Sequence, residues 1–563
     1  ARGMRFTTVW SNHPVCAAAR TAIITGLHAH SSGGIHMRSM IALPKEMRLF
    51  PEYLRDAGYY CGNNRKEDYN VPTPSTTWTD SSARAHWRHR RPDQPFFAVF
   101  NSEKSHESQI RRKPHTLVTD PKRVRVPAYH PDTPDVRQDW AKYYDAVSAA
   151  DAEAGKRLAE LAEDGLTENT IVFYYGDHGS GMPRSKRWPS HSGLHVPLVV
   201  YFPQKWQHLA PGGYGPGASS DRLIGFVDLA PTLLSLAGIR PPEWMEGHAF
   251  AGIYAADAPA YLFGSRGRMD EAPDLVRSVT DGRYIYLRNF FTHVSQGQHV
   301  LYQFETPTTR IWRELFDAKK TNQAQSIFWQ TPRLPEELYD LSQDRDEVHN
   351  LAHDPASQPV LARLRAALTD HLKQTRDITF LPEAEMFARA TQWSKSPYEL
   401  ARTPTGYSAE RVLKMADQAS IPQSSLEVFA EGMKDTESGV RYWAAMGFLM
   451  KGARSVPHHP ALREALSDPS PSVRCVAAEV LGRYGSPDDR QKALDTLKDL
   501  VSPDRYGTLI TLAALTVVYE LGDRASSLKP VIASISTQDG EPHPRYQSYV
   551  GRLVQKITAA GAP

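Results

Sequence analysis

The sequence has few cysteines, no long hydrophobic run and little net charge. Its three cysteines are too few for a disulfide framework, and their scarcity leaves the redox compartment open. No apolar run approaches the ~20 residues that cross a bilayer, so we predict no membrane span. A formal net charge of +3 over 563 residues provides no basic excess for nucleic acid. The composition therefore points away from membrane-spanning and nucleic-acid-binding proteins.

The start of the chain also lacks expected features. It begins Ala1-Arg2-Gly3, with no initiator Met and no visible signal peptide. None of the fifteen residues before Cys16 is Asp or Glu. A chain that begins in this way is expected to be a processed or truncated product, so the absence of a signal peptide excludes nothing.

The first ~340 residues have the pattern of an α/β protein. Runs of β-branched and aromatic residues at 94–100, 170–175 and 197–202 are typical of buried strands. Apolar residues recur at helical spacing from Trp140 to Leu161, and Gly165 is placed to end that helix. Helix and strand in alternation predict a mostly parallel sheet sandwiched by helices.

Two further regions follow. Alternating residues around Asp281-Gly282 predict a hairpin in a small antiparallel sheet, which residues 337–341 would join. Beyond residue 383, the segment 435–445 resembles 468–478 at an offset of 33 residues, with a weaker third copy. This period is typical of stacked helix pairs and resembles HEAT repeats, with the aspartate as the helix cap. We expect a catalytic domain over 1–265, a subdomain over 266–380 and an α-helical repeat domain over 381–563.

Cys16 stands at the predicted start of a short helix, four residues before Arg20. A helix N-terminus favours an anion, and residues four apart share one helix face. This arrangement suits an oxyanion ester, although a lone buried cysteine is more often a core residue. Cys61 and Cys475 lie in apolar surroundings and are predicted to be core.

The segment Cys16-Ala-Ala-Ala-Arg20, followed by Thr21-Ala-Ile-Ile-Thr-Gly26, resembles the signature of the sulfatase family. Ala18 stands where that signature usually has proline. Other segments resemble the family in the same order, so that the resemblance covers roughly 1–375: Arg5-Phe-Thr7, Gly176-Asp-His-Gly179, Lys186 with Ser192–Pro197, Val227–Leu234 and Glu337–Leu341. The heparan N-sulfatase-like group is the most similar in character.

The resemblance implies a fold like alkaline phosphatase and a site assembled from distant segments. It assigns catalysis to Cys16, Arg20, Lys66, His106 and Lys186. It assigns a divalent metal, Ca²⁺ with Mg²⁺ as the alternative, to Asp177, His178 and the formylglycine made from Cys16. Two metal-binding aspartates of the family would lie upstream of residue 1, on a first strand that the catalytic domain would lack.

Simpler readings of these residues exist. Asp177-His178-Gly179 alone would be an ordinary turn, and Lys186 a surface charge. Asp68 stands where the family usually has a second catalytic histidine. His13, His28 and His30 flank the signature, and we expect them to be solvated in loops; His195 is equally suited to packing or to substrate contact.

The resemblance implies hydrolysis of sulfate esters or sulfamates on a sulfated glycan. A hydrated formylglycine at position 16 would attack sulfur, and its second oxygen would then expel sulfate. The partners implied are a sulfated saccharide, the formylglycine-generating enzyme and a protein bound through the helical repeats, and the location is periplasmic or extracellular. The alternatives are a phosphonate or phosphodiester hydrolase of the same superfamily and a non-catalytic sulfatase-like binding protein.

Overall fold

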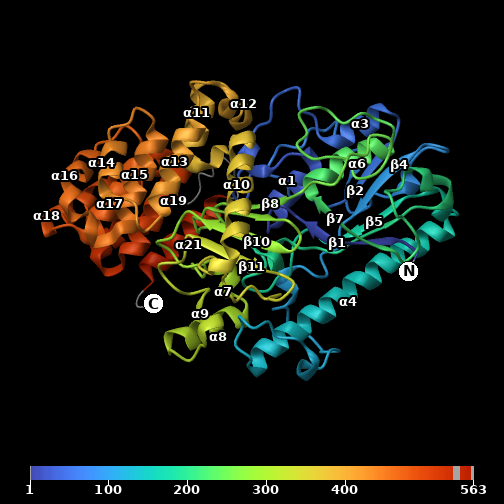
Figure 1. Ribbon diagram of the computed structural model, residues 1–563, viewed down its shortest axis with the longest axis horizontal. Helices are drawn as coiled ribbons and strands as arrows, with labels where there is room; N and C mark the ends of the chain where they lie inside the picture. The colour runs from blue at the N-terminus through green and yellow to red at the C-terminus, as the bar shows by residue number, and fades with distance from the viewer. Residues whose placement is uncertain (1, 537–545, 560–563) are drawn as a thin grey trace.

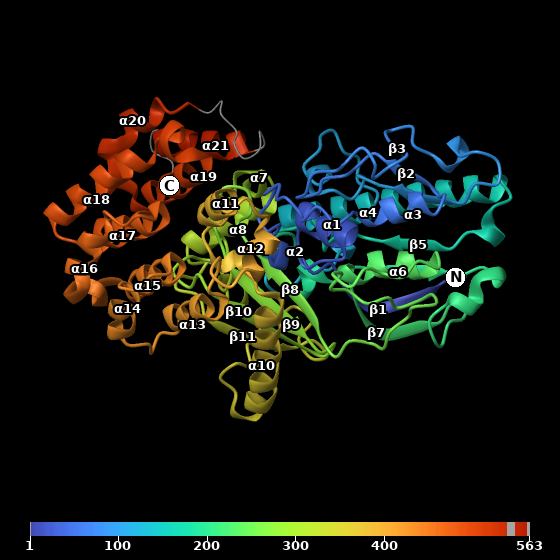
Figure 2. The same ribbon diagram turned by 90° about the horizontal axis from the view of Figure 1, so that it is seen from above.

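The computed structural model describes residues 2–536 and 546–559. Figure 1 shows an α/β region at one side, a small antiparallel sheet in the centre and a helical region at the other side. The view from above in Figure 2 gives the same order. The α/β class, the antiparallel sheet and the helical C-terminal region are as predicted.

A mixed four-stranded sheet carries the N-terminal region, in the order β5-β6-β1-β7. Its strands are β1 (Met4–Trp10), β5 (Val172–Tyr175), β6 (Leu198–Tyr201) and β7 (Ser219–Gly225). β1 pairs in parallel with β7 but antiparallel with β6, and β5 also pairs antiparallel with β6. Between β5 and β6 there is only the short helix α5 (His191–Leu194), so the chain turns back without a long crossover helix.

A second sheet is entirely parallel, in the order β3-β2-β4. Its strands are β2 (Tyr60–Asn64), β3 (Asp80–Ser81) and β4 (Phe96–Phe100). Three helices, α1 (Cys16–Thr25), α3 (Phe50–Asp56) and α6 (Leu229–Leu236), pack against one another. The long helix α4 (Pro134–Glu163) contains the predicted helix; Thr133 caps its start by accepting a hydrogen bond from the Val136 N–H, and Gly165 follows its end with φ of 67°.

The antiparallel sheet has the order β11-β10-β9-β8. It comprises β8 (Leu262–Arg266), β9 (Val276–Thr280), β10 (Tyr284–Asn289) and β11 (Glu336–Asp340). The predicted hairpin joins β9 and β10, with Val279 opposite Tyr286 and Gly282 in the turn at φ of 94°. Helix α10 (Gln358–Thr375) packs across β9 and β10.

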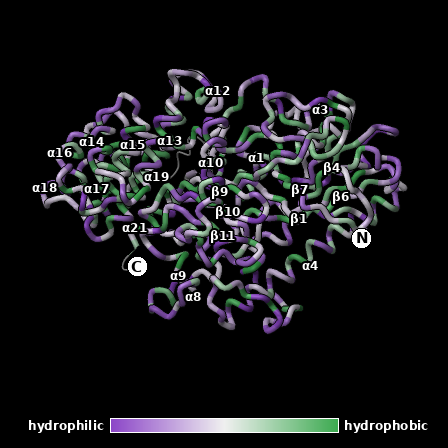
Figure 3. Tube along the Cα trace, in the orientation of Figure 1, coloured by the Kyte–Doolittle hydropathy of each residue, from purple (hydrophilic) through white to green (hydrophobic). Residues whose placement is uncertain are grey.

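The repeats form pairs of helices. α15 (Ser438–Lys451) and α17 (Pro471–Tyr484) contain the two clear copies, and α19 (Pro503–Leu521) contains the third. In Figure 3 hydrophobic and hydrophilic residues alternate along these helices. The predicted role of the aspartates was wrong: Glu437 and Ser470 are the N-cap residues, while Asp435 and Asp468 accept hydrogen bonds from the N–H groups two residues later, in the preceding turns.

The remaining helices complete the element list. They are α2 (Ala29–Ser32), α7 (Leu301–Phe304), α8 (Pro307–Asp317), α9 (Gln323–Ser326), α11 (Glu383–Gln392), α12 (Pro397–Arg402), α13 (Ala409–Ser420), α14 (Leu426–Gly432), α16 (His459–Ala465), α18 (Pro487–Leu500), α20 (Lys529–Ala533) and α21 (Gln547–Thr558). Within residues 2–536 and 546–559, none of the helices has the length and apolar character needed to cross a membrane.

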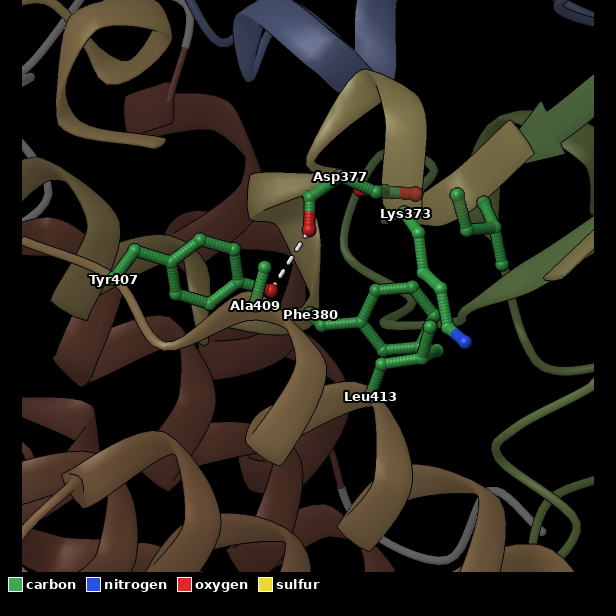
Figure 4. A pocket seen from close by; sticks show the side chains of 7 residues that line it. Lys373, Asp377, Phe380, Tyr407, Ala409 and Leu413 are labelled. Carbon is green, nitrogen blue, oxygen red and sulfur yellow. Dashed lines mark hydrogen bonds between the residues drawn. The ribbon is translucent and has the colours of Figure 1, made fainter. Parts of the chain in front are cut away.

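The helical region contacts the rest of the chain at the C-terminal end of α10. Figure 4 shows a small pocket there, with Tyr407 pointing toward Asp377. The Tyr407 hydroxyl donates to the backbone oxygen of Asp377 at 2.8 Å, and Phe380 and Leu413 line the same pocket. This contact anchors the segment before α13 to the segment after α10.

Candidate active site

Cys16 is the first residue of α1. Val15 before it is extended, with φ of −153°, and the first helical hydrogen bond runs from the Ala19 N–H to the Val15 oxygen at 3.0 Å. The N–H groups of the first helical turn therefore have no partner within the helix and favour negative charge near Cys16. The side chain is 3% exposed, and its Sγ lies 3.2 Å from Nε2 of His178.

Asp177 and His178 follow β5 in a tight turn. Gly179 holds this turn: its N–H donates to the Gly193 oxygen at 2.9 Å, and a Cβ there would lie 2.0 Å from the Ser192 oxygen. Nδ1 of His178 contacts the Gly179 carbonyl oxygen at 2.7 Å, which requires a proton on Nδ1. Nε2 is therefore the atom that His178 presents to Cys16.

Arg20 links three segments of the site. Its Nε donates to Asp177 Oδ2 at 3.2 Å, and its Nη1 donates to Asn101 Oδ1 at 2.8 Å and to the Lys66 backbone oxygen at 3.3 Å. Burial raises the pKa of Asp177, but His178 and Arg20 together outweigh burial and hold that pKa well below its usual range. Asp177 is thus a carboxylate at any physiological pH.

Lys186 is not a surface charge, because only 3% of its side chain is exposed. Its Nζ lies 3.7 Å from Glu107 Oε1, and Arg187 holds Glu107 through two hydrogen bonds of 2.9 and 2.8 Å. Burial lowers the pKa of Lys186, but the nearby Cys16 thiolate and Glu107 outweigh it and raise that pKa overall. Lys186 therefore stays cationic beside Cys16.

His106 and Lys66 approach the same site from the segments after β4 and β2. His106 begins a short 3₁₀ turn, and its Nδ1 accepts from the Ser108 N–H at 3.3 Å. His106 also contributes to the lowered pKa of the Cys16 thiol. The charge of Lys66 contributes to the lowered pKa of Asp177. All the predicted catalytic and metal-binding residues are therefore gathered around Cys16.

The electrostatic character of the site is positive. Burial raises the pKa of the Cys16 thiol and Asp177 adds to this, but Lys186 and His178 with His106 outweigh both, and the pKa falls well below its ordinary value. A pocket that favours a thiolate also favours another anion at the same place. The arrangement suits the oxygens of a sulfate or phosphate group.

The donor atoms of Cys16, Asp177 and His178 lie within 4.8 Å of one another, which is close enough to share one ion. Carboxylate oxygen and imidazole nitrogen both suit a divalent cation. Ca²⁺ takes 6–8 oxygen ligands, and among these three side chains only Asp177 supplies oxygen, so a Ca²⁺ shell would need further oxygen ligands. The residues present therefore fit a divalent metal, with further ligands needed.

Three residues that shape the site were not predicted: Asn101, Glu107 and Arg187. Asn101 directly follows β4 and orients Arg20, while its own amide donates to Asn63 Oδ1 at 3.0 Å. A polar residue at the carboxyl end of a strand was the available signal for Asn101. No pattern in the sequence pairs Glu107 with Arg187, because eighty residues separate them.

The other histidines are buried in the structure. The predicted solvation of His13, His28 and His30 was wrong, since each is at most 6% exposed. His13 accepts from the Ala29 N–H at 3.0 Å, and burial lowers the pKa of His28 to about 4. His195 stacks on His191 and contacts the Thr7 oxygen at 2.9 Å, so it packs. Cys61 and Cys475 are core residues, as predicted.

Comparisons with known proteins found similarity to sulfatases and to HEAT repeats. The Sulfatase family matches residues 1–239, and the HEAT repeats family matches residues 426–516. An ulvan-active sulfatase of Formosa agariphila is 35% identical over 433 residues, covering 68% of this chain and 71% of the relative. The human N-sulphoglucosamine sulphohydrolase is 24% identical over 444 residues, covering 67% and 84%. A solved phosphonate monoester hydrolase from Silicibacter pomeroyi has a TM-score of 0.48 at 16% identity, covering 68% of this chain and 90% of that one.

Proposed function

Because the chain belongs to the sulfatase family, we propose that it hydrolyses sulfate esters or sulfamates of a sulfated glycan at the site around Cys16. The observation that carries this proposal is the position of Cys16 at the N-terminus of α1, facing Asp177, His178 and Lys186. The names of the relatives, which include ulvan and glucosamine sulfatases, support a sulfated saccharide as the substrate class.

The cationic side chains would bind the sulfuryl group. Lys186 is buried and charged, and the charge of Lys66 acts on the neighbouring Asp177, so we assign both to donation to sulfuryl oxygens. Arg20 donates to Asp177 and Asn101, so that it fixes the first helical turn relative to β4 and β5. Negative charge that develops on the sulfuryl oxygens would then be stabilised by hydrogen-bond donors that are already in position.

A divalent metal and a modified Cys16 complete the proposal. Asp177, His178 and the residue at position 16 would hold the metal, for which Ca²⁺ is our first choice and Mg²⁺ the alternative. Formylglycine at position 16 would supply the nucleophilic oxygen, and the metal would stabilise negative charge on it. The modification requires a formylglycine-generating enzyme as a partner.

Proton transfer to the leaving group would fall to His106 or Lys186. His106 is half-exposed and turns one ring nitrogen toward Ser108, so that its other nitrogen is available to the substrate. Lys186 is the alternative proton donor, and its ammonium group is held near Glu107.

The proposal extends to the domain boundaries, a protein partner and the location of the protein. We place the catalytic domain at 1–265, its antiparallel subdomain at 266–380 and the repeat domain at 381–563. The HEAT repeats support a protein partner, because solenoids of this type offer extended surfaces. A polymeric sulfated glycan cannot enter a cell intact, which supports a periplasmic or extracellular location for the natural protein.

One experiment tests the enzyme proposal directly. Tryptic cleavage after Arg5 and Arg20 releases residues 6–20, and mass spectrometry of this peptide distinguishes thiol from aldehyde at position 16. Formylglycine together with turnover of sulfated glycan fragments supports the proposal. A persistent thiol, in a host that makes formylglycine, would favour a non-catalytic binding protein.

A second assay separates the other alternative. Sulfate and phosphonate monoesters with the same leaving group are compared side by side. A higher kcat/KM for the sulfate supports our reading, and a higher value for the phosphonate replaces it with a phosphonate hydrolase.

A further inference from the structure

A second cluster of metal-binding side chains lies away from Cys16. His28, His30 and His371 each offer a ring nitrogen, and these nitrogens lie within 4.8 Å of one another. The ring centroids are 4.7 Å apart for His28 and His371, 5.1 Å for His28 and His30, and 5.2 Å for His30 and His371. We call these three residues the histidine trio.

The trio joins two distant parts of the chain. His28 and His30 follow α1, and His371 lies in the last turns of α10, more than 340 residues later. His371 also stacks flat on Phe263 of β8, with 3.7 Å between ring centroids. The three rings are therefore brought together by the segment after α1 and by α10, with β8 packed against His371.

The trio has unused ligand capacity in a dry environment. All three residues are buried, at 1–8% exposure, yet Nδ1 of His28 and Nε2 of His371 have no hydrogen-bond partner among residues 2–536 and 546–559. A buried polar atom without a partner is costly, so such atoms call for an explanation. A metal ion that contacts both nitrogens would supply a partner to each of them and is therefore one such explanation.

The protonation state of the trio also suits a metal. Burial is the main cause that lowers the pKa of His28 to about 4 and the pKa values of His30 and His371 well below the usual value. The rings are therefore neutral at pH 7, and neutral imidazole is the form that ligates metal. Histidine is a common ligand of Zn²⁺, Cu²⁺, Ni²⁺ and Fe²⁺, and a set of three imidazoles without a carboxylate suits these ions better than Ca²⁺ or Mg²⁺, which prefer oxygen.

Neighbouring groups are compatible with a cation at this place. The positive charge of Arg277 contributes to the lowered pKa values of His30 and His371, and Arg277 is itself paired with Asp377 at 2.7 Å. The carboxyl group of Glu246 accepts from the backbone N–H of His28 at 2.9 Å and so lies next to the trio. Ser265 and Thr375 contact the two nitrogens of His30 at 3.3 and 3.4 Å, and either hydroxyl can hold the nitrogen that does not face the ion.

We propose that His28, His30 and His371 bind one Zn²⁺ ion in a structural site that fastens the segment after α1 to α10. Three imidazoles with a water or hydroxyl in the fourth position form an established type of zinc coordination. At Zn–N distances of about 2.0–2.1 Å, tetrahedral nitrogens lie about 3.4 Å apart, so the rings close in by rotation when the ion binds.

The zinc site and the catalytic site lie at opposite ends of one helix. Cys16 begins α1 and the trio follows its end, and a ten-residue helix is about 15 Å long. An ion in the trio therefore makes no contact with substrate. It fixes the end of the helix whose start positions Cys16.

The test uses the natural protein with the catalytic cluster disabled. Asp177→Asn removes the carboxylate ligand at Cys16, so that a zinc ion bound tightly by this variant belongs to another site. After chelation, calorimetric titration with Zn²⁺ should show one equivalent, and X-ray absorption should show a shell of three imidazole nitrogens at about 2.0–2.1 Å. Absence of tight binding, or a shell that contains sulfur at about 2.3 Å, would overturn the proposal.

A matched pair of variants locates the ion. His371→Gln in the Asp177→Asn background should lower the zinc affinity more than a hundredfold. His36→Gln in the same background is the control, because His36 is also buried with an unpartnered nitrogen but lies outside the trio. Equal zinc affinities in the two double variants would refute the assignment. If His371→Gln fails to fold, the absorption shell of the Asp177→Asn protein decides alone.

Discussion

Arg20 is the residue on which the geometry of the candidate active site depends most. It donates to Asp177, Asn101 and the Lys66 backbone, so a single guanidinium connects the segments after β2, β4 and β5. Its planar group can reach several acceptors at fixed angles, which an ammonium cannot do. Arg20 therefore fixes the position of α1 relative to the segments that carry Lys66, Asn101 and Asp177.

We expect Arg20→Lys to fold normally and to lose activity. Lysine keeps the charge but can satisfy only part of the three contacts, so Asp177 and Asn101 lose their fixed positions. The expected fall in kcat/KM is about 10²–10³-fold, the size seen when one positioned donor is lost from a charged site. Steady-state kinetics with a sulfated disaccharide measure it.

Arg48→Lys is the matched control. Arg48 also pairs with an aspartate, Asp56, at 2.7 Å, but on the exposed surface near α3. That change should leave kcat/KM unaltered. Equal activities of Arg20→Lys and the wild-type protein would show that the connection through Arg20 is not needed.

The sequence predicted those site residues that lie within local motifs. Cys16 and Arg20 share one helical turn, and Asp177 and His178 lie in one glycine turn, so short patterns identify them. Glu107 and Arg187 were missed because their pairing is decided only when two loops meet. The burial of His28 was missed for the same reason, since its partner His371 comes from a helix far along the chain.

At the level of elements, α17 carries a carboxylate in an unfavourable place. Glu479 is 7% exposed and faces the interior of the repeats. Burial raises its pKa to about 7, Glu520 adds to the rise, and Arg483 opposes it. Between its unfolded pKa of about 4.3 and about 7, the folded protein binds more protons than the unfolded chain.

Glu479 should therefore make the repeats less stable as the pH rises from about 5 to about 8. Glu479→Gln removes the ionisation. We therefore expect the free energy of unfolding of this variant to exceed that of the wild-type protein by about 1–3 kcal/mol at pH 8 and to match it at pH 5. Thermal unfolding at both pH values tests this. Glu464→Gln, on the exposed face of α16, is the control and should show no such trend. A stability difference that stays constant with pH would contradict the prediction.

Element types were easier to predict than element pairing. The runs that became β4, β5 and β6 were recognised from their apolar residues, and the repeat helices from their period. The antiparallel direction of β6 could not be predicted, because it depends on a β5–β6 connection that contains the candidate site residues Asp177, His178 and Lys186 in place of a long helix. The caps of α15 and α17 were misplaced by two residues, because Asp435 and Asp468 serve the preceding turns.

At the scale of the whole molecule, Arg268 joins the catalytic and helical regions. It makes two hydrogen bonds to Glu383 of α11, at 2.7 and 3.1 Å, and a third to the Met37 oxygen at 3.1 Å. Its guanidinium also lies over the rings of Tyr546 and Tyr549, at 4.9 and 5.3 Å. One buried cation therefore contacts the N-terminal region, the start of the repeats and the C-terminal helix.

A row of ion pairs runs beside this junction. Lys186 faces Glu107, Arg187 pairs with Asp270 at 3.4 Å, and Arg552 of α21 lies 3.7 Å from the same aspartate. The last described helix is thereby connected to charges that surround Cys16. The repeats are thus part of the support of the catalytic region, in addition to any surface they offer to a partner.

Because of this junction, the two regions should unfold together in the wild-type protein and separately in Arg268→Met. The substitution leaves Glu383 buried with Tyr546 as its remaining polar partner at 2.7 Å, and removing one member of a buried pair costs about 3–5 kcal/mol. Scanning calorimetry should then resolve two transitions in place of one. Arg552→Met is the control: its pair with Glu271 at 3.3 Å is partly exposed and worth at most about 1 kcal/mol, so a single transition should persist. Two transitions in the wild-type protein would contradict the coupling of the regions. A single transition in Arg268→Met would mean that apolar packing across the interface joins them and that the buried pair is dispensable.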